Sequence, residues 1–338
     1  MFPSGVEVRQ RVLARIRTPS VLLNRTLKEL GLLDDLRALV RGAPRSAVTP
    51  PTSFLELQGA SLRSKLAKAI DYPGVHGRAR TLLDGVEITV DPGEVVGRSL
   101  LFGLPFEAGE LRVFSTLLSP GNVFLDVGAN CGMYSIIANN RLGPGGRIFA
   151  FEPNPTVREL LTANLRKRDQ GPAITILSTA IGNSVGEVTF SCSDDSAYSG
   201  LGHTGRSEVA ATIRVASSTL DHFVREQALP RVDVMKVDVE GFEAEVLSGG
   251  SALLSAPNAP AIMIEVADEN LAGRGSSESA VLGQLRSFGY EILAITRHGS
   301  LVEAASASKL GHHDFLALKP PRRSRVQALL ENGSPRAD

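Results

Sequence analysis

A glycine-containing turn at residues 128–132, framed by two apolar segments that each end on an acid, constrains this chain more than any other feature. The first segment, Val123 to Leu125, is short and β-rich, as expected of a buried parallel strand, and it ends on Asp126. A helical pattern follows the turn and stops at the glycines of 143–146. The second segment, residues 147–151, ends on Glu152. The pattern predicts a β–turn–α–β unit with an acid at the end of each strand.

The residues of this unit indicate a nucleoside site at the carboxyl edge of a parallel sheet. Gly128 and Gly132 let the backbone approach a ligand because neither has a Cβ atom, and Glu152 is placed to accept hydrogen bonds from two ribose hydroxyls. Asn130 stands where the dinucleotide fingerprint needs its second glycine, and no G-x-x-x-x-G-K-[ST] phosphate loop occurs in the sequence. A turn poor in phosphate-binding features, with acids around it, favours a cationic nucleoside without phosphates. S-adenosylmethionine is such a ligand.

Three sequence blocks occur in order along the chain: D-V-G-A-N-C-G-M-Y-S from Asp126, F-E-P-N-P from Phe151, and D-V-M-K-V-D-V-E-G from Asp233. Together they resemble the FkbM family of S-adenosylmethionine-dependent methyltransferases, over some two-thirds of the chain, from about Phe106 to Leu318. The resemblance implies a class I methyltransferase (Rossmann-like) fold, a seven-stranded, mostly parallel sheet with helices on both faces. It also implies methyl transfer to a hydroxyl oxygen of a small molecule, namely a sugar, a glycolipid or a macrolide-type natural product.

Composition agrees with an aliphatic α/β protein, because 43% of the 338 residues are hydrophobic and none is tryptophan. Two cysteines, Cys131 and Cys192, do not make a disulfide framework and have no metal-type neighbours, so we expect a reducing, cytoplasmic location. No apolar run approaches the ~18 residues of a membrane-spanning helix, so we expect a soluble protein without a transmembrane segment.

The charge is unevenly distributed. Residues 1–80 hold 14 Lys and Arg against 6 Asp and Glu, so this part carries +8 in a chain with no net charge. We interpret the basic part as the solvated face of helices packed on an acidic catalytic domain; contact with an acidic partner or a membrane surface is the alternative. The acidic remainder and the lack of interleaved aromatic and basic residues disfavour nucleic acid as substrate. The expected partner is a small hydroxylated molecule, and homo-oligomerisation stays open.

Four regions are predicted along the chain: a helical N-terminal region at 1–78, a small β element at 79–105, the methyltransferase domain at 106–319 and a flexible tail at 320–338. Within the domain, Asn154 is expected to cap a helix with Pro155 at its first position. Ser218-x-x-Asp221 is expected to be a capping box. The expected strands after residue 170 are 174–180, a pair at 187–192 and 212–216, then 232–237, 262–264, 290–295 and 315–318.

Cofactor binding is assigned to the glycine turn and to the ends of the second, third and fourth predicted strands. Related folds bind the adenine edge at the end of the third strand. These residues are Asp126, Gly128, Asn130, Gly132, Glu152, Asn154, Ala180, Ile181 and Asp238. Four strand ends present Asp126, Glu152, Asp238 and Glu265, and so many carboxylates along one edge repel one another unless a cation is bound. The sulfonium and amino groups of the cofactor supply such charge.

Methyl transfer requires an aligned acceptor and removal of its proton, because the sulfonium already activates the methyl group. Lys236, Asp238 and Glu240 alternate, so they lie on one side if the strand continues that far. Lys236 would then be buried and orient the acids, or form a structural ion pair. Asp238 and Glu240 are candidates for the base, for binding the cofactor amine or for metal ligation. His203, in a polar loop at 193–207, is a further candidate base.

Three alternatives stay open. By analogy with metal-dependent O-methyltransferases, Asp238 and Glu265 would share Mg²⁺. A nicotinamide-dependent oxidoreductase is a rival class because Glu152 lies 20 residues after Gly132, although Asn130 argues against it. A noncatalytic nucleoside-binding scaffold is the third, and the intact acids at the strand ends argue against it.

Overall fold

The computed structural model describes residues 78–91, 94–102, 106–165, 170–193, 209–271, 274–304 and 313–320, with positions 322, 323, 326 and 330. Nearly all of the expected helical region at 1–78, the loop that carries His203 and most of the expected tail lie outside these residues. Two compact units are distinguished, and the larger comprises the described residues from 106 onward together with Leu83–Ile88. The domain boundaries drawn from the sequence stay a prediction.

The hairpin expected before residue 90 is present. Strands β1 (Ala79–Leu83) and β2 (Val86–Val90) form a two-stranded sheet, followed by helix α6 (Val95–Phe102). Asp84 and Gly85 connect the strands with φ angles of 50° and 77°. Two consecutive residues with positive φ match the twist of a tight hairpin, which is why an Asp-Gly pair is found there.

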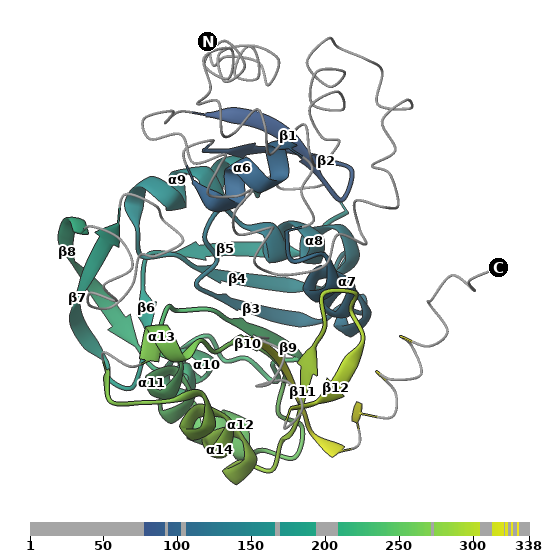
Figure 1. The fold of residues 1–338 in the computed structure, drawn as a ribbon, viewed down its shortest axis with the longest axis vertical. Coiled ribbons are helices and arrows are strands. Elements are labelled where there is room, and N and C mark those ends of the chain that lie inside the picture. The colour runs from purple at the N-terminus through teal and green to yellow at the C-terminus, as the bar shows by residue number, and fades with distance from the viewer. Residues whose placement is uncertain are drawn as a thin grey trace, which may run out of the picture. The chain divides into compact units, whose positions relative to one another are not determined.

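A central sheet dominates the larger unit, and eight of its strands lie within the described residues (Figure 1). Their order is β12-β11-β13-β10-β9-β3-β4-β5. The bounds in chain order are β3 (Val123–Val127), β4 (Arg147–Phe151), β5 (Ala173–Leu177), β9 (Val234–Val237), β10 (Ala261–Glu265), β11 (Glu291–Ile295), β12 (Leu301–Glu303) and β13 (Asp314–Leu318).

Strands β5, β4, β3, β9 and β10 pair in parallel, and β13 pairs antiparallel with both β10 and β11. The expected mostly parallel sheet is therefore confirmed. The eighth strand, β12, was not expected, because three residues are too few to give a periodic signal. The reversal at β13 matters for the site, because its first residue lies at the same edge as the last residues of the parallel strands.

Helices cover both faces of the central sheet. On one face α10 (Leu220–Glu226), α11 (Glu243–Ser248), α12 (Ser251–Ser255) and α14 (Glu278–Ser287) enclose the large apolar core. On the other face lie α7 (Ala108–Leu117) and α8 (Met133–Arg141), where Phe114 of α7 contacts Phe124 of β3 and Tyr134 of α8, each at 5.0 Å between ring centroids. Because side chains alternate along a strand, Asp126 lies on the same face as Phe124, beneath α8.

Helix α9 (Pro155–Asn164) begins as expected. The Asn154 side chain accepts a hydrogen bond from the Thr156 N–H at 3.1 Å, and Pro155 occupies the first helical position. Asn154 is buried, and its own N–H donates to Glu152, so one residue both caps the helix and fixes the acid beside it.

A smaller sheet of three strands, β6-β8-β7, also lies in the larger unit. Strands β7 (Gly186–Ser193) and β8 (Val209–Ser218) are the antiparallel pair expected from the sequence. The single strand expected at 174–180 is wrong. Strand β5 ends at Leu177, and Ala180 belongs instead to β6 (Ala180–Ile181), which pairs with β8. A local run of β-forming residues does not reveal that the chain changes sheets at Ser178 and Thr179.

The expected capping box is displaced by one residue. Thr219, not Ser218, caps α10, and its hydroxyl accepts from the His222 N–H at 3.1 Å. Asp221 instead accepts from the N–H groups of Ala252 and Leu253, at 2.9 and 2.8 Å, and so caps the distant helix α12. Both Ser218 and Thr219 suit an N-cap by composition, and only the tertiary fold supplies the second helix that takes Asp221.

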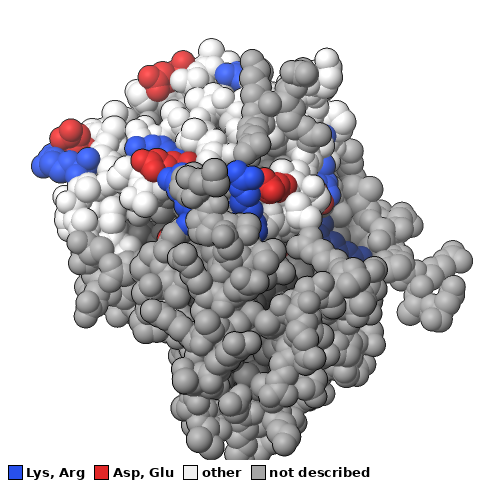
Figure 2. All heavy atoms as spheres, turned by 90° about the horizontal axis from the view of Figure 1, so that it is seen from above, with Lys and Arg blue, Asp and Glu red and all other residues white. Residues whose placement is uncertain are grey.

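None of the helices in the described part of the chain combines the length and the apolar character needed to cross a membrane. The described surface visible in Figure 2 carries basic and acidic side chains beside one another. One exposed pair of this kind in the larger unit is Arg214 with Glu187, 2.9 Å apart on the smaller sheet. Such exposed pairs contribute little to stability.

Candidate active site

The turn after β3 holds its shape through three residues with positive φ: Gly128 at 85°, Asn130 at 48° and Gly132 at 93°. The N–H groups of Gly128 and Ala129 donate to the Phe151 carbonyl at 3.1 and 2.9 Å, which fastens the turn to the end of β4. Asn130 accepts a left-handed conformation better than most residues, because its short side chain bonds locally. Here its Oδ1 accepts from the Cys131 N–H at 2.6 Å.

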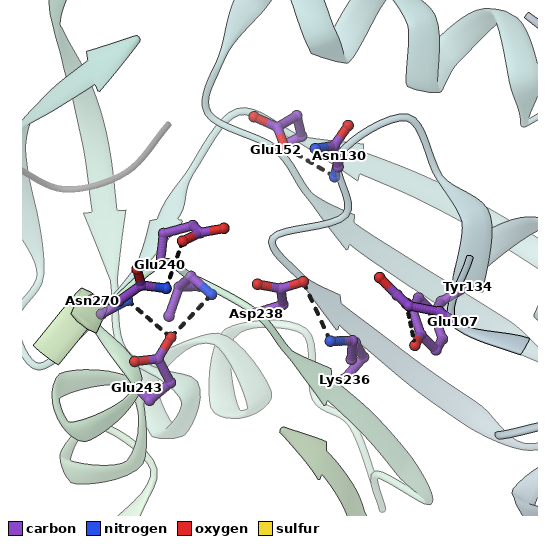
Figure 3. Close-up of polar contacts among 11 residues, drawn as sticks. Glu107, Asn130, Tyr134, Glu152, Lys236, Asp238, Glu240, Glu243 and Asn270 are labelled. Carbon is purple, nitrogen blue, oxygen red and sulfur yellow. Dashed lines mark hydrogen bonds and ion pairs between the residues drawn. The ribbon is translucent and has the colours of Figure 1, made fainter. Parts of the chain in front are cut away.

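Glu152 follows β4 directly and faces this turn (Figure 3). Its Oε2 accepts from the Asn130 N–H at 3.0 Å and its Oε1 from the Asn154 N–H at 2.8 Å. Only 6% of the residue is exposed. These two contacts orient the carboxylate, whose oxygens can each accept more than one hydrogen bond. The predicted neighbourhood of Asn130, Glu152 and Asn154 is therefore present.

Asp126 lies deeper than the sequence predicts. Strand β3 continues through Val127, so Asp126 is inside the strand and fully buried. Its Oδ2 accepts from the Ser135 hydroxyl of α8 at 2.6 Å, while its Oδ1 has no hydrogen-bond partner among the described residues. Burial raises the pKa of Asp126 to about 6, against the opposing effects of Ser135 and of the Lys236 ammonium. The residue supports the turn from below.

Lys236 and Asp238 come together as predicted (Figure 3). The Lys236 ammonium lies 3.3 Å from Asp238 Oδ2 and 5.1 Å from the centre of the Tyr134 ring, and its side chain is only 2% exposed. In the parallel register Lys236 is opposite Asp126, so the two side chains share one face of the sheet. Burial alone would lower the pKa of Lys236, yet the surrounding carboxylates, Asp238 first, raise it above its ordinary value.

The carboxylates around Lys236 come from three further elements. Glu107, ahead of α7, accepts from the Tyr134 hydroxyl at 2.6 Å. Glu265 ends β10, and Asp314 opens β13 directly opposite it. Burial raises the pKa of Glu107 and of Asp314, whereas the Asp238 carboxylate, followed by burial, raises that of Glu265. Because one ammonium faces several acids, the group holds protons more tightly than isolated carboxyls do.

Asp314 was not recognised as a site residue from the sequence. It is the first residue of its strand rather than the last, and the rule that ligands bind at carboxyl ends does not mark it. The signal that would have found it is the antiparallel direction of β13, since reversing a strand places its first residue at the edge where β10 ends. Strand direction depends on pairing and is not encoded in the local pattern.

Glu240 does not join Lys236 and Asp238. Strand β9 ends at Val237, and Glu240 has a φ of 52°, so the alternation of sides breaks down. The Glu240 carboxylate accepts from Asn270 Nδ2 at 2.7 Å, toward α13 (Asp268–Leu271) (Figure 3). The expectation that all three residues lie on one side, which required the strand to continue, is therefore wrong for Glu240.

Ala180 and Ile181 are both buried, in the smaller sheet rather than at the end of β5. Ile181 packs in the large core and Ala180 in a second cluster with Phe190 and Val215. Their role in adenine binding stays a prediction, as do the cofactor and catalytic roles of the other site residues. His203 lies outside the described residues.

A metal site receives no geometric support. Among the described residues, no group of three or more His, Cys, Asp or Glu side chains is arranged to hold a metal ion. Asp238 already pairs with the Lys236 ammonium, and Glu265 lies within its electrostatic reach. The charge that a divalent ion would supply to these acids is in part supplied by the lysine.

The sheet order, the reversed strand β13 beside β10, the helices on both faces and the glycine turn beside an acid define a class I, Rossmann-like methyltransferase fold. Residues 126–292 match the methyltransferase FkbM domain, so this part of the chain is similar to that family. The match begins on Asp126 and ends inside β11, so it covers the turn, Glu152, Lys236, Asp238 and Glu265.

Curated relatives share parts of the chain. Hexuronic acid methyltransferase AglP of Haloferax volcanii is 34% identical over 154 residues, which are 44% of this chain and 60% of AglP. The AMB antimetabolite synthetase AmbE of Pseudomonas aeruginosa is 27% identical over 213 residues, 52% of this chain and 10% of AmbE. The 2-O-methyltransferase NoeI of Sinorhizobium fredii is 26% identical over 196 residues, 52% of this chain and 76% of NoeI. This chain thus spans less than two-thirds of the first two.

Among solved structures, Aeropyrum pernix fibrillarin is 18% identical with a TM-score of 0.33, covering 73% of this chain and 85% of fibrillarin. Precorrin-6y C5,15-methyltransferase of Geobacter metallireducens is 17% identical with a TM-score of 0.35, and the match covers 63% of this chain and 88% of that protein. Likenesses this weak add nothing to what the strand order shows.

Proposed function

We propose that this protein transfers a methyl group from S-adenosylmethionine to a hydroxyl oxygen of a small molecule. The observation that carries the proposal is the fixed carboxylate of Glu152 beside the turn of Gly128 to Gly132. Its two oxygens are held by backbone N–H groups from the turn and from the cap of α9. A carboxylate fixed in this way, at the end of the strand next to the glycine turn, is suited to accept both hydroxyls of a ribose.

The charge of the neighbouring edge fits the rest of such a cofactor. Asp238, Glu265, Asp314 and Glu107 surround a single buried ammonium, that of Lys236, and raise its pKa. A sulfonium and an amino group bring positive charge to an edge where carboxylates otherwise repel one another. A cofactor with a pyrophosphate would bring negative charge to the same place. The electrostatics therefore favour the sulfonium nucleoside over nicotinamide dinucleotides.

The proposed transfer needs two things from the protein. It must align the acceptor oxygen with the methyl group, and alignment alone contributes up to ~7–11 kcal/mol. It must also accept the proton that the hydroxyl loses as the oxygen attacks. Asp238 is the candidate for this step, because its side chain is 27% exposed while Lys236 beneath it is 2% exposed. Lys236 then orients the carboxylate from below without touching the acceptor.

The acceptor class rests on the relatives. One is named a hexuronic acid methyltransferase and another a 2-O-methyltransferase, which supports a sugar hydroxyl as acceptor. Glycolipids and macrolide-type natural products remain within the proposed class. We assign no step to Mg²⁺, because the acids that would share it, Asp238 and Glu265, face the Lys236 ammonium instead.

Calorimetric titration with S-adenosylmethionine and with NAD tests the proposal directly. The wild-type protein should bind the sulfonium nucleoside, and Glu152→Ala should bind it at least ~10-fold more weakly, a loss of about 1.4 kcal/mol typical of hydrogen bonds to a charged group. Glu187→Ala, on the smaller sheet, is the matched control and should bind like wild type. Uptake of NAD without uptake of S-adenosylmethionine would identify an oxidoreductase.

Turnover distinguishes an enzyme from a scaffold. The protein should transfer radiolabelled methyl from the cofactor to members of a panel of hydroxylated glycosides. Tight cofactor binding with no transfer to any acceptor would favour the noncatalytic nucleoside-binding module.

A further inference from the structure

Glu243, the first residue of α11, holds the turn that follows β9 (Figure 3). Its Oε1 accepts hydrogen bonds from two backbone N–H groups of that turn, Gly241 at 3.1 Å and Val239 at 3.3 Å. The residue is only 2% exposed. These two N–H groups stand on either side of Glu240, so one buried carboxylate fixes the backbone between Asp238 and α11.

The turn held by Glu243 is conformationally demanding. Glu240 and Gly241 have φ angles of 52° and 97°, and a residue with a side chain adopts this left-handed conformation at an energetic cost. At Gly241 a Cβ atom would lie 2.5 Å from the Asn270 carbonyl oxygen. The Asn270 side chain also donates to Glu240 at 2.7 Å. A strained turn persists only when its surroundings determine it, and here Glu243 and Asn270 do so from two sides.

The surroundings of Glu243 are charged on several elements. Asp238, at the end of β9, raises its pKa, and Glu245 lies on the same helix. Arg274 interacts electrostatically with both Glu243 and Glu245, and its guanidinium stacks 3.3 Å from the centre of the Phe242 ring. The second oxygen of Glu243, Oε2, is buried with no hydrogen-bond partner among the described residues. Burial, the largest effect, raises the pKa of Glu243 to about 7.

We propose that Glu243 is a positioning residue for methyl transfer: by binding the Val239 and Gly241 N–H groups it fixes the turn that presents Asp238 and Glu240. The proposal rests on the proposed function, because positioning has a kinetic meaning only if methyl transfer occurs. The clamp itself is a structural property and is measurable without any acceptor. Glu243 touches no candidate reacting atom, so it acts through the backbone that carries the acids.

Hydrogen exchange of the turn tests the clamp in the whole protein. Amide exchange at Val239 and Gly241 should be about 10-fold faster in Glu243→Ala than in wild type, the factor that corresponds to one net hydrogen bond of roughly 1.4 kcal/mol. In Glu243→Gln, whose amide oxygen accepts from the same two N–H groups, exchange should stay within ~3-fold. If Glu243→Ala does not fold, Glu243→Asp, which is one methylene too short, replaces it. Unchanged exchange in the truncated variant would overturn the clamp.

Kinetics test the consequence. Glu243→Ala should lower kcat by ~10²-fold, the size of effect expected from a small misplacement of reacting groups, while the KM for S-adenosylmethionine changes by less than ~3-fold. Glu243→Gln should restore most of kcat. A kcat that is unaffected in Glu243→Ala would refute the positioning role.

The two proposals fail separately. If wild type methylates no acceptor, the proposed function is lost, and the exchange measurement still decides whether Glu243 holds the turn. If wild type is active and exchange at 239 and 241 is insensitive to Glu243, the clamp is lost and the proposed function stands.

Discussion

A Cβ atom added to Gly128 would lie 1.8 Å from the carbonyl oxygen of Asp238. The glycine turn after β3 and the acid after β9 therefore meet at backbone distance, and the Asp238 N–H donates to the Val127 carbonyl at 3.0 Å. This contact brings the expected cofactor turn and the expected catalytic acid to one place on the sheet edge. It also makes Gly128 irreplaceable for two reasons, since its φ of 85° belongs to the left-handed region.

Gly128→Ala should destabilise the protein by more than about 3 kcal/mol and abolish S-adenosylmethionine binding, because the methyl group forces the ends of β3 and β9 apart. Urea unfolding and calorimetry measure the two effects. Gly283→Ala is the matched control: it lies in α14 with open space around it, and alanine there should be neutral or stabilising by up to about 1 kcal/mol. Equal stability of the two variants would contradict the contact.

Asp126→Asn should gain stability relative to wild type as pH rises. Burial raises the pKa of Asp126 from 3.8 to about 6, so the folded state binds this proton more tightly than the unfolded state. Wild-type stability should therefore fall as pH increases through that window. The difference in unfolding free energy between Asp126→Asn and wild type should shift by roughly 2 kcal/mol in favour of Asp126→Asn between pH 4 and pH 7. Unfolding in urea at both pH values measures it, and a difference that does not change with pH would refute the assignment.

Lys236→Met should destabilise the protein by about 3–5 kcal/mol, because it leaves the surrounding carboxylates without their buried counter-charge. The destabilisation should be larger at pH 8 than at pH 5. At the lower pH the surrounding acids are protonated more readily, so they need the counter-charge of Lys236 less. Lys319→Met is the control: Lys319 is also buried, but its ammonium donates to the Phe288 carbonyl and burial lowers its pKa. The destabilisation caused by Lys319→Met should not grow with pH. Calorimetric melting of both variants at the two pH values decides the matter.

Asp238→Asn should bind S-adenosylmethionine within ~3-fold of wild type yet lose about 10²–10⁴-fold in kcat, the contribution of a positioned base. Single-turnover methyl transfer and calorimetry separate the two quantities. Glu240→Gln is the comparison, because Glu240 faces Asn270 instead of Lys236; it should retain far more activity. The opposite ranking would make Glu240 the base. Wild type and Glu240→Gln should both keep full activity in excess chelator.

The central unit was readable from the chain because its signals are local. An apolar run, a glycine turn, a helical period and an acid at residue 152 each occupy a few consecutive positions, and β3, α8, β4 and the cap of α9 follow them closely. The Asp-Gly hairpin turn was readable for the same reason. In each case one residue type is favoured by a backbone conformation that neighbours in sequence already require.

The errors share a different origin. Ala180 leaves the central sheet, Asp221 caps a helix 31 residues further along the chain, and Glu240 turns toward α13. Asp314 joins the acids because β13 runs antiparallel to β10. Each of these facts is a relationship between segments distant in sequence, which periodicity does not carry. Glu243 was overlooked likewise, since only burial and its bonds to the turn distinguish it from an ordinary helical glutamate.

The sequence by itself determined the alternation of strands and helices and the identity of the turn and of most acids at the sheet edge, because short-range sterics and hydrophobic periodicity act between near neighbours. Tertiary structure alone decided which acids share the Lys236 ammonium, how deep Asp126 lies, and which carboxylate holds the turn after β9. Those outcomes depend on strand order, strand direction and desolvation. All three exist only once the chain has brought its distant segments together.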